Sequence, residues 1–199
     1  MGRPRQKDGE VATPARLLDA ALVEFARFGY EGAKLAEIAE RAGISRPSLL
    51  YHYSSKDELY GALVKKVLTD IGGILGAALG GPGDFRARLD AVIGAFGAFT
   101  GDQPLAARVI LREVMDDRGP GHHLILEVGV PLIDAVERFI QEEGQGVISP
   151  ELPVRQALLQ VVSAAFLRSA TGALEPALWG EGDHHLVLAR TLFLGGNPR

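Results

Sequence analysis

The chain has 199 residues but no cysteine, one tryptophan and two methionines. Without cysteine it forms no disulfide, no thiolate metal site and no cysteine nucleophile. No apolar run reaches the roughly 18 residues that a membrane-spanning helix needs. The first residues also lack the apolar segment of a signal peptide. These absences predict a cytoplasmic protein without a membrane partner.

Signatures of catalysis are also missing. The sequence contains no G-x-S-x-G elbow, no glycine-rich phosphate loop, no H-E-x-x-H and no spaced carboxylate pair, so we expect neither an enzyme nor a cofactor. One cluster suggests a metal ion: Glu113, Asp116, Asp117, His122 and His123. Neighbouring residues on a helix point about 100° apart, which rarely brings adjacent histidines to one ion. We therefore predict no metal site.

Lysine is scarce and unevenly placed. All five lysines lie in the first third of the sequence, and residues 1–66 hold 11 basic and 9 acidic side chains. Residues 67–199 hold 10 and 16. This asymmetry indicates that the N-terminal part meets an anion, although a chance distribution explains it equally well.

The hydrophobic pattern is helical almost throughout, which predicts an all-α fold. Leu18, Ala21, Leu22, Phe25 and Phe28 recur at three- and four-residue steps and are expected to form the inward face of the first helix, with Thr13 as its N-cap. The helices are expected at about 14–28, 35–42, 46–53, 56–79, 84–100, 104–117, 122–143, 154–173 and 184–195.

The stretch from Gly43 to Leu59, "GISRPSLLYHYSSKDEL", carries a helix-turn-helix pattern. Gly43 suits a left-handed helix end, and Ser45 suits an N-cap. Pro47 then falls in the first turn, where its missing N–H is tolerated. Ser55 and Glu58 have the spacing of a capping box that starts the next helix. Two short helices joined by a glycine-containing turn place the second helix in the DNA major groove.

Side chains around this second helix suit DNA. Arg46 can pair with guanine, Ser48 can donate or accept, and Pro47 can touch a thymine methyl. Leu49 is expected as the buried anchor. The predicted DNA-binding residues are Lys34, Ser45, Arg46, Pro47, Ser48, Tyr51, His52 and Lys56. Each also has an ordinary explanation: a solvated arginine, a structural histidine, or a tyrosine packed in the core.

Residues 13–60 resemble the DNA-binding domain of the tetracycline-repressor-like (TetR) family of bacterial transcriptional regulators. The matching stretches are "TPARLLDAALVEFARFGYEG", "IAERAGIS" and "SLLYHYSSKDEL". Two positions depart from the family pattern. Lys34 replaces the hydroxyl residue that usually caps the second helix, and Leu50 stands where a tyrosine is frequent. "GRPRQK" near the N-terminus resembles the basic arm of some members, or is a tail that touches nothing.

The resemblance implies two domains. A helix-turn-helix domain with a short basic arm would cover 1–60, and a helical effector-binding and dimerisation domain would cover 61–199. It also implies a homodimer through the last two long helices, although a single buried core helix would show the same pattern. The residues predicted at the dimer interface are Leu158, Val162, Ala165, Phe166, Ser169, Leu188 and Leu192.

An effector pocket is expected among the helices over 84–143, backed by the helix over 154–173. Its predicted lining, which ordinary core packing would explain as well, is Phe96, Phe99, Met115, Phe139, Phe166 and Trp179. The resemblance implies a repressor that a small hydrophobic effector releases from a palindromic double-stranded DNA operator. The alternative is a helical ligand-binding or scaffolding protein with lost or altered DNA recognition.

Overall fold

In the computed structural model, residues 14–116 and 119–195 are described, and they contain helices and no strand. The predicted all-α fold is therefore confirmed. The chain folds into two compact units, Met1–Leu63 and Val64–Arg199. Thr13, Asp117 and the arm "GRPRQK" lie outside the described residues, so their predicted roles stay predictions.

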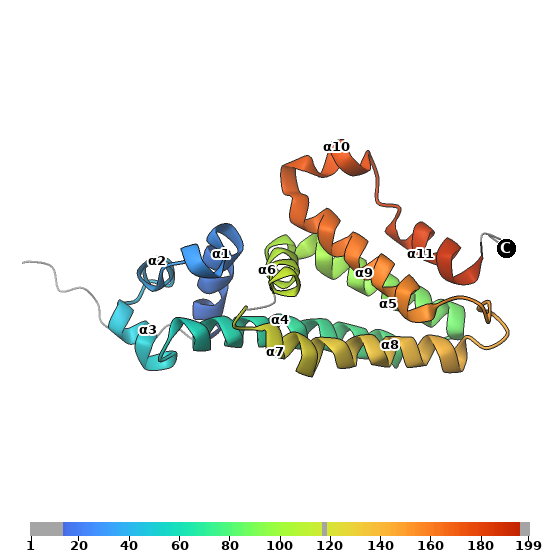
Figure 1. Ribbon diagram of the computed structural model, residues 1–199, viewed down its shortest axis with the longest axis horizontal. Helices are drawn as coiled ribbons and strands as arrows, with labels where there is room; N and C mark the ends of the chain where they lie inside the picture. The colour runs from blue at the N-terminus through green and yellow to red at the C-terminus, as the bar shows by residue number, and fades with distance from the viewer. Residues whose placement is uncertain (1–13, 117–118, 196–199) are drawn as a thin grey trace, which may run out of the picture. The chain divides into compact units, whose positions relative to one another are not determined.

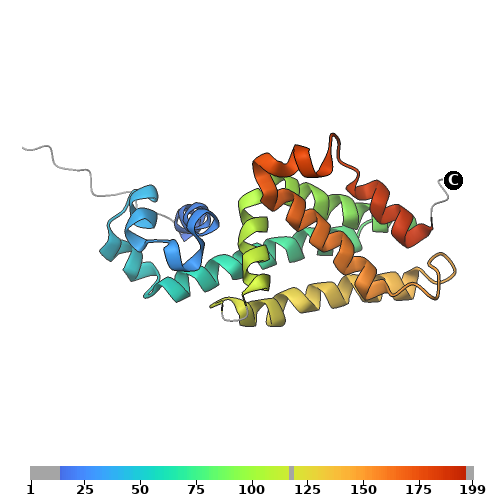
Figure 2. The ribbon, with the colours of Figure 1, turned by 45° about the horizontal axis from the view of Figure 1, so that its top comes forward.

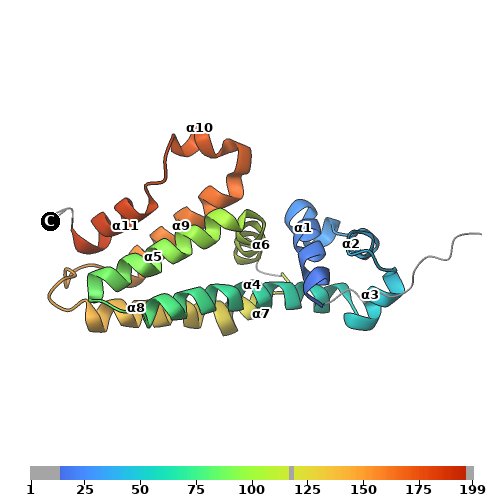
Figure 3. The same ribbon diagram turned by 180° about the vertical axis from the view of Figure 1, so that it is seen from behind.

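The first unit is built from three helices and the start of a fourth. These are α1 (Pro14–Gly32), α2 (Leu35–Arg41), α3 (Arg46–His52) and α4 (Lys56–Leu79), and Figure 3 shows α2 and α3 following α1. The helices are held together by side chains that are at most 1% exposed: Leu17, Phe25, Ile38, Leu49 and Leu59. The predicted anchor role of Leu49 is confirmed.

The inward face of α1 matches the prediction in part, since Ala21 and Phe25 are buried as expected. Leu17 and Ala21 are fully buried, whereas Phe28 is 53% exposed beneath the guanidinium of Arg27, 5.5 Å from the ring centroid. The observed apolar stripe is rotated by about one residue from the predicted one, because the helical period allows two neighbouring stripes and the packing partners choose between them. The helix expected to end at residue 28 is interrupted at Gly29, whose φ of 71° breaks the helical backbone before helical residues resume up to Gly32.

The second unit contains the rest of α4 and the remaining helices (Figures 1 and 2). In chain order these are α5 (Phe85–Asp102), α6 (Pro104–Met115), α7 (His122–Leu124), α8 (Val130–Glu143), α9 (Val154–Thr171), α10 (Glu175–Trp179) and α11 (His185–Leu194). α9 packs on α5, α6, α8 and α11, so it is the central helix of this unit.

The helix expected over 122–143 is interrupted. A five-residue π-helical turn, Ile125–Gly129, separates α7 from α8, and the amide of Val130 bonds to the carbonyl of Ile125. Pro131 explains the interruption. It has no N–H for the carbonyl four residues before it, and its ring would clash with that carbonyl in a regular α-helix.

The helical stretch Val154–Trp179 is longer than predicted. A 3₁₀ turn and α10 continue it beyond Thr171, in a region expected to be a loop. By length and composition alone this stretch could cross a membrane, contrary to the sequence prediction, and only 22% of its apolar window is buried. Such a test is also passed by core helices of soluble proteins, so the stretch is weak evidence for a membrane.

Candidate nucleic-acid interface and ligand cavity

The turn between α2 and α3 has a fixed backbone geometry. Gly43 lies in the left-handed region with φ 72°, and its amide bonds to the carbonyl of Glu40 at 3.0 Å. The amide of Ile44 bonds to the carbonyl of Ala39, also at 3.0 Å. These two bonds form a Schellman motif, as the glycine predicted. Arg16 on α1 donates to the carbonyl of Ala42 at 3.2 Å, which ties the turn to the first helix.

The first turn of α3 is also held as predicted. Ser45 has an extended backbone, and its hydroxyl accepts the amide of Ser48 at 3.2 Å. Pro47 falls within the first two helical positions. The cap and the proline stabilise the helix start, so α3 is fixed in direction despite its seven residues.

Side chains suited to DNA are displayed around the buried anchor Leu49. Ser45, Arg46, Pro47, Tyr51 and Lys34 are exposed, Tyr51 to 87%, and Ser48, His52 and Lys56 are half-buried. The His52 ring meets that of Tyr51 edge to face at 5.6 Å. Across the described residues, Arg46 has no ion pair. α3 therefore presents an unpaired guanidinium beside a fixed helix start.

Lys56 has protein partners that the sequence did not reveal. Its ammonium donates to the carbonyl of Glu31 at 3.1 Å and lies 4.7 Å from the centroid of the Tyr30 ring. Tyr30 in turn donates to the carboxylate of Asp57. These contacts fasten the start of α4 to the end of α1. The predicted phosphate contact of Lys56 would use donors left over from this structural role.

The capping box at the start of α4 forms in part. The amide of Glu58 donates to the hydroxyl of Ser55 at 3.1 Å, as predicted. The carboxylate of Glu58, however, accepts from Ser54, at 2.8 Å from its amide and 2.6 Å from its hydroxyl. These hydrogen bonds lower the pKa of Glu58. Burial, with a further contribution from Glu58, raises the pKa of Tyr53.

Lys34 occupies the N-cap of α2 with an extended backbone and makes no side-chain cap hydrogen bond. Its exposed ammonium can approach a phosphate as a point charge. The absent cap leaves the first amides of α2 without a side-chain acceptor from this position.

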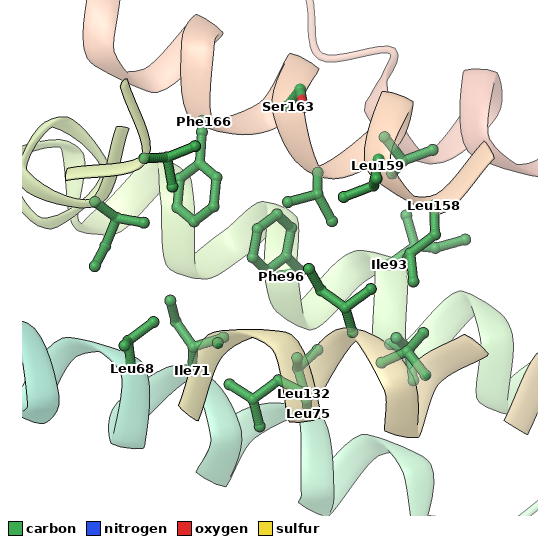
Figure 4. A pocket seen from close by; sticks show the side chains of 18 of the residues that line it. Leu68, Ile71, Leu75, Ile93, Phe96, Leu132, Leu158, Leu159, Ser163 and Phe166 are labelled. Carbon is green, nitrogen blue, oxygen red and sulfur yellow. The ribbon is translucent and has the colours of Figure 1, made fainter. Parts of the chain in front are cut away.

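A cavity of about 250 Å³ lies within the second unit, among α4, α5, α6, α8, α9 and α11. Figure 4 shows Leu68, Ile71 and Leu75 of α4 on one side and residues of α9 on the other. The lining has 23 residues, of which Ser163 is the only one with a polar side chain. Such a cavity suits an apolar ligand.

The predicted pocket residues divide into three groups. Phe96 and Phe166 line this cavity, with their rings edge to face at 5.2 Å. Phe99, Met115 and Phe139 do not line it, which corrects the prediction. Met115 is 79% exposed at the end of α6, and Phe139 packs against Phe85 in the core. Spacing alone could not show which side of a helix faces the cavity.

Trp179 lines a different hollow, of about 460 Å³, between the C-terminal ends of α5 and α9 and the α10–α11 segment. Arg168 crosses it with ion pairs to Glu175 at 2.8 Å and Asp183 at 2.9 Å. His185 packs beside it with a buried Nε2 atom that has no hydrogen-bond partner among the described residues. Burial lowers the pKa of His185, and Arg168 lowers it further against the opposing charge of Asp183.

The residues predicted at a dimer interface mostly face the interior of their own chain. Leu158, Val162 and Phe166 line the cavity, Ala165 is buried, and the Ser169 hydroxyl donates to the carbonyl of Thr100. These α9 residues therefore have packing partners within their own chain, and their predicted place at a dimer interface stays a prediction, because an apolar stripe does not say whether its partner is internal or external. Leu188 and Leu192 of α11 are exposed, at 67% and 39%.

The described part of the chain contains no group of three or more histidine and acidic side chains arranged to hold a metal ion. Glu113, from the cluster weighed for a metal, is instead buried on α6 with its carboxylate facing Gly119 and Gly121. Asp117, which lies outside the described residues, is not covered by this finding.

Comparison with known proteins identifies the first unit. Residues 17–63 match the model of bacterial regulatory proteins of the tetR family. Over 52 residues the chain is 46% identical to the HTH-type transcriptional regulator RutR of Escherichia coli strain K12, covering 26% of this chain and 24% of RutR. Over 81 residues it is 42% identical to the HTH-type transcriptional activator FasR of Mycolicibacterium smegmatis, covering 41% of this chain and 37% of FasR.

A solved structure resembles the chain over most of its length. The transcriptional regulator FadR from Bacillus subtilis, in complex with stearoyl-CoA, superposes with a TM-score of 0.74 and 18% identity, covering 93% of this chain and all of that one. At this identity the likeness shows the fold. The sequence matches span only about a quarter to a third of the relatives' length. Residues 17–63 therefore carry the N-terminal domain typical of the tetR family of bacterial regulatory proteins.

Proposed function

We propose that the chain is a DNA-binding transcriptional regulator, acting in the cytoplasm as a homodimeric repressor that a small apolar effector releases from a palindromic operator. The observation that carries the proposal is α3. Its capped first turn displays Arg46 and Pro47 while Leu49 anchors it from below. A helix held in this way can place its N-terminal side chains against base edges in the major groove.

Relatives with similar N-terminal domains support this proposal. RutR and FasR are named as transcriptional regulators, one of them an activator, and B. subtilis FadR was solved with stearoyl-CoA. Repression is the direction that we propose for this chain. A reporter fused to its own promoter would rise when the chain is deleted if it represses, and fall if it activates.

An exposed apolar surface supports the dimer. Leu159 and Leu167 on α9 and Val187, Leu188 and Leu192 on α11 are all at least 39% exposed, and the two helices pack on each other. Large exposed apolar surfaces mark interfaces. A twofold dimer would read two half-sites about 34 Å apart. Leu188→Glu should give a monomer in sedimentation velocity, and an unchanged dimer would contradict this surface.

α4 supplies a route from effector to DNA. The same helix contributes Leu59 and Tyr60 to the core of the first unit and Leu68, Ile71 and Leu75 to the cavity lining. If α4 has two positions, an effector that binds one of them more tightly shifts the protein toward that position. The affinity for DNA then changes by as much as the effector's affinities for the two positions differ.

The proposal is tested by fluorescence anisotropy with the chain's own upstream DNA and scrambled DNA over a salt series. Arg46→Ala should lose about 1–3 kcal/mol of the preference for its own DNA. Arg46→Lys is the matched control: it keeps the charge but loses the two-pronged guanidinium. It should lose much of the preference while keeping the salt slope on scrambled DNA.

Equal and weak binding of the native protein to both DNAs would contradict recognition of this site. If the same holds for a wider set of genomic fragments, the competing function gains support: a ligand-binding protein with lost DNA recognition. The uncapped α2 at Lys34 is the observation that favours that alternative.

A further inference from the structure

The cavity in the second unit differs from most small-molecule sites in having almost nothing to hydrogen-bond. Leucine, isoleucine and valine supply 18 of its 23 lining residues, and phenylalanine supplies three. Small-molecule sites ordinarily add a few placed polar groups that fix the ligand's orientation. Here Ser163 alone could do so, and it lies on an exposed position of α9.

No side chain in the lining carries a charge. Glu113 directly precedes the lining residue Val114 and is buried. Its carboxylate, however, faces Gly119 and Gly121. An ionised ligand group inside the cavity would therefore lose its hydration without gaining an ion pair. Burial of such an unpaired charge is strongly unfavourable.

The lining of the cavity is buried at some positions and exposed at others. Leu89, Ile140 and Phe193 are at most 2% exposed, whereas Val114 is 57% and Leu159 39% exposed. Figure 4 shows side chains from α4, α5, α8 and α9 meeting across the space between these helices. A ligand with one apolar end and one polar end fits this gradient, with its apolar end among the most buried residues.

We infer that the cavity binds the aliphatic tail of a single-headed amphiphile, and that the polar head stays outside the cavity beside the exposed lining residue Val114. This inference names the effector class and so rests on the proposed function. The cavity selects the tail by its length and by its apolar end. It places few demands on the head, since no charged side chain lines the cavity.

Two other ligand classes fit less well. A heteroaromatic effector with several nitrogen or oxygen atoms would leave those atoms without partners, each at the cost of its lost hydration. A molecule with a charge at both ends would have to bury one of them. An aliphatic tail that ends in a methyl group incurs neither of these costs.

The experiment is calorimetric titration of the full chain, without DNA, with fatty acids of eight to sixteen carbons below their aggregation concentrations. We expect one site per chain and an affinity that rises about fourfold per methylene until the cavity is filled, then levels. The dicarboxylic acid of the best length should bind at least a hundredfold more weakly. The matched fatty alcohol and acyl-CoA thioester, which differ only in the head, should bind within about tenfold of the acid.

Two substitutions change the cavity in opposite directions. Val92→Phe fills the lining beside Phe96 and should move the best ligand to a shorter length, whereas Phe193→Leu enlarges the cavity at a buried lining position and should move it to a longer one. Circular dichroism and thermal unfolding check that each variant folds, and the native chain-length series stands without them.

An affinity that does not depend on chain length, or a dicarboxylic acid that binds as tightly as the monocarboxylic acid, would overturn the inference. These results are distinct from a failure of the proposed function. If an aliphatic acid binds the chain but DNA recognition is absent, the inference holds and the regulator proposal fails. If DNA recognition is specific but no aliphatic molecule binds, the reverse is true.

Discussion

The two units of the chain use their surfaces in different ways. The first buries Leu17, Phe25 and Leu49 almost completely and displays Arg46 and other polar groups. The second encloses an apolar cavity and leaves leucines such as Leu188 exposed on α11. The first unit therefore has a buried core and a polar surface suited to a polyanion. The second has apolar surface, inside and outside, that a ligand and a second subunit would cover.

Removal of an anchor in the first unit should have the largest effect. Leu49→Ala empties a fully buried position and should lower the free energy of unfolding by about 2–5 kcal/mol, measured by urea denaturation. Tyr51→Ala, two residues away and 87% exposed, should change it by less than about 0.5 kcal/mol yet weaken DNA binding. Similar losses in both variants would show that exposure does not separate packing from recognition on α3.

A cap placed on α2 should also separate stability from DNA binding, this time by raising stability. Lys34→Ser supplies the missing side-chain acceptor and should raise the free energy of unfolding by about 0.5–2 kcal/mol. It also removes a cation, so the slope of log K for DNA against log salt should become less steep by about one unit. An unchanged slope would show that Lys34 does not approach a phosphate.

In the second unit, His185 should make stability depend on pH. Burial lowers its pKa below the ordinary value of about 6.5, so its neutral form stabilises the fold above that pH and the contribution is lost as pH falls. The difference in unfolding free energy between the native chain and His185→Gln should shrink from pH 7.5 to pH 5.5. His123→Gln controls for loss of an exposed histidine. A difference that does not vary with pH would argue against burial of the imidazole.

The contrast between local and long-range interactions explains which features the sequence could predict. Ser45, Gly43 and Pro47 act through local backbone geometry, which sequence spacing specifies, and their predicted positions are confirmed. The role of Lys56 could not be predicted, because its partner Glu31 lies 25 residues away along the chain. The π turn could have been suspected from Pro131 in an otherwise helical pattern.

Prediction is weakest where only an apolar pattern is available. The pattern assigns Phe166 to both the cavity and a dimer interface, and it lines the cavity. It also assigns Met115 and Phe139 to the cavity, but one is exposed and the other lies in the core. A helical stripe identifies an apolar face but not the surface opposite it, which depends on packing between helices distant in the sequence.

The most direct test of the account is DNA release by a cavity ligand. Anisotropy of the complex between the native chain and its own upstream DNA would be followed while the tightest-binding fatty acid is added, with Val92→Phe beside it. We expect the native complex to dissociate in the concentration range where the acid binds the free chain, and the filled variant to need far more acid. DNA that stays bound at saturating acid, or equal release from both proteins, would contradict the coupling of this cavity to DNA recognition.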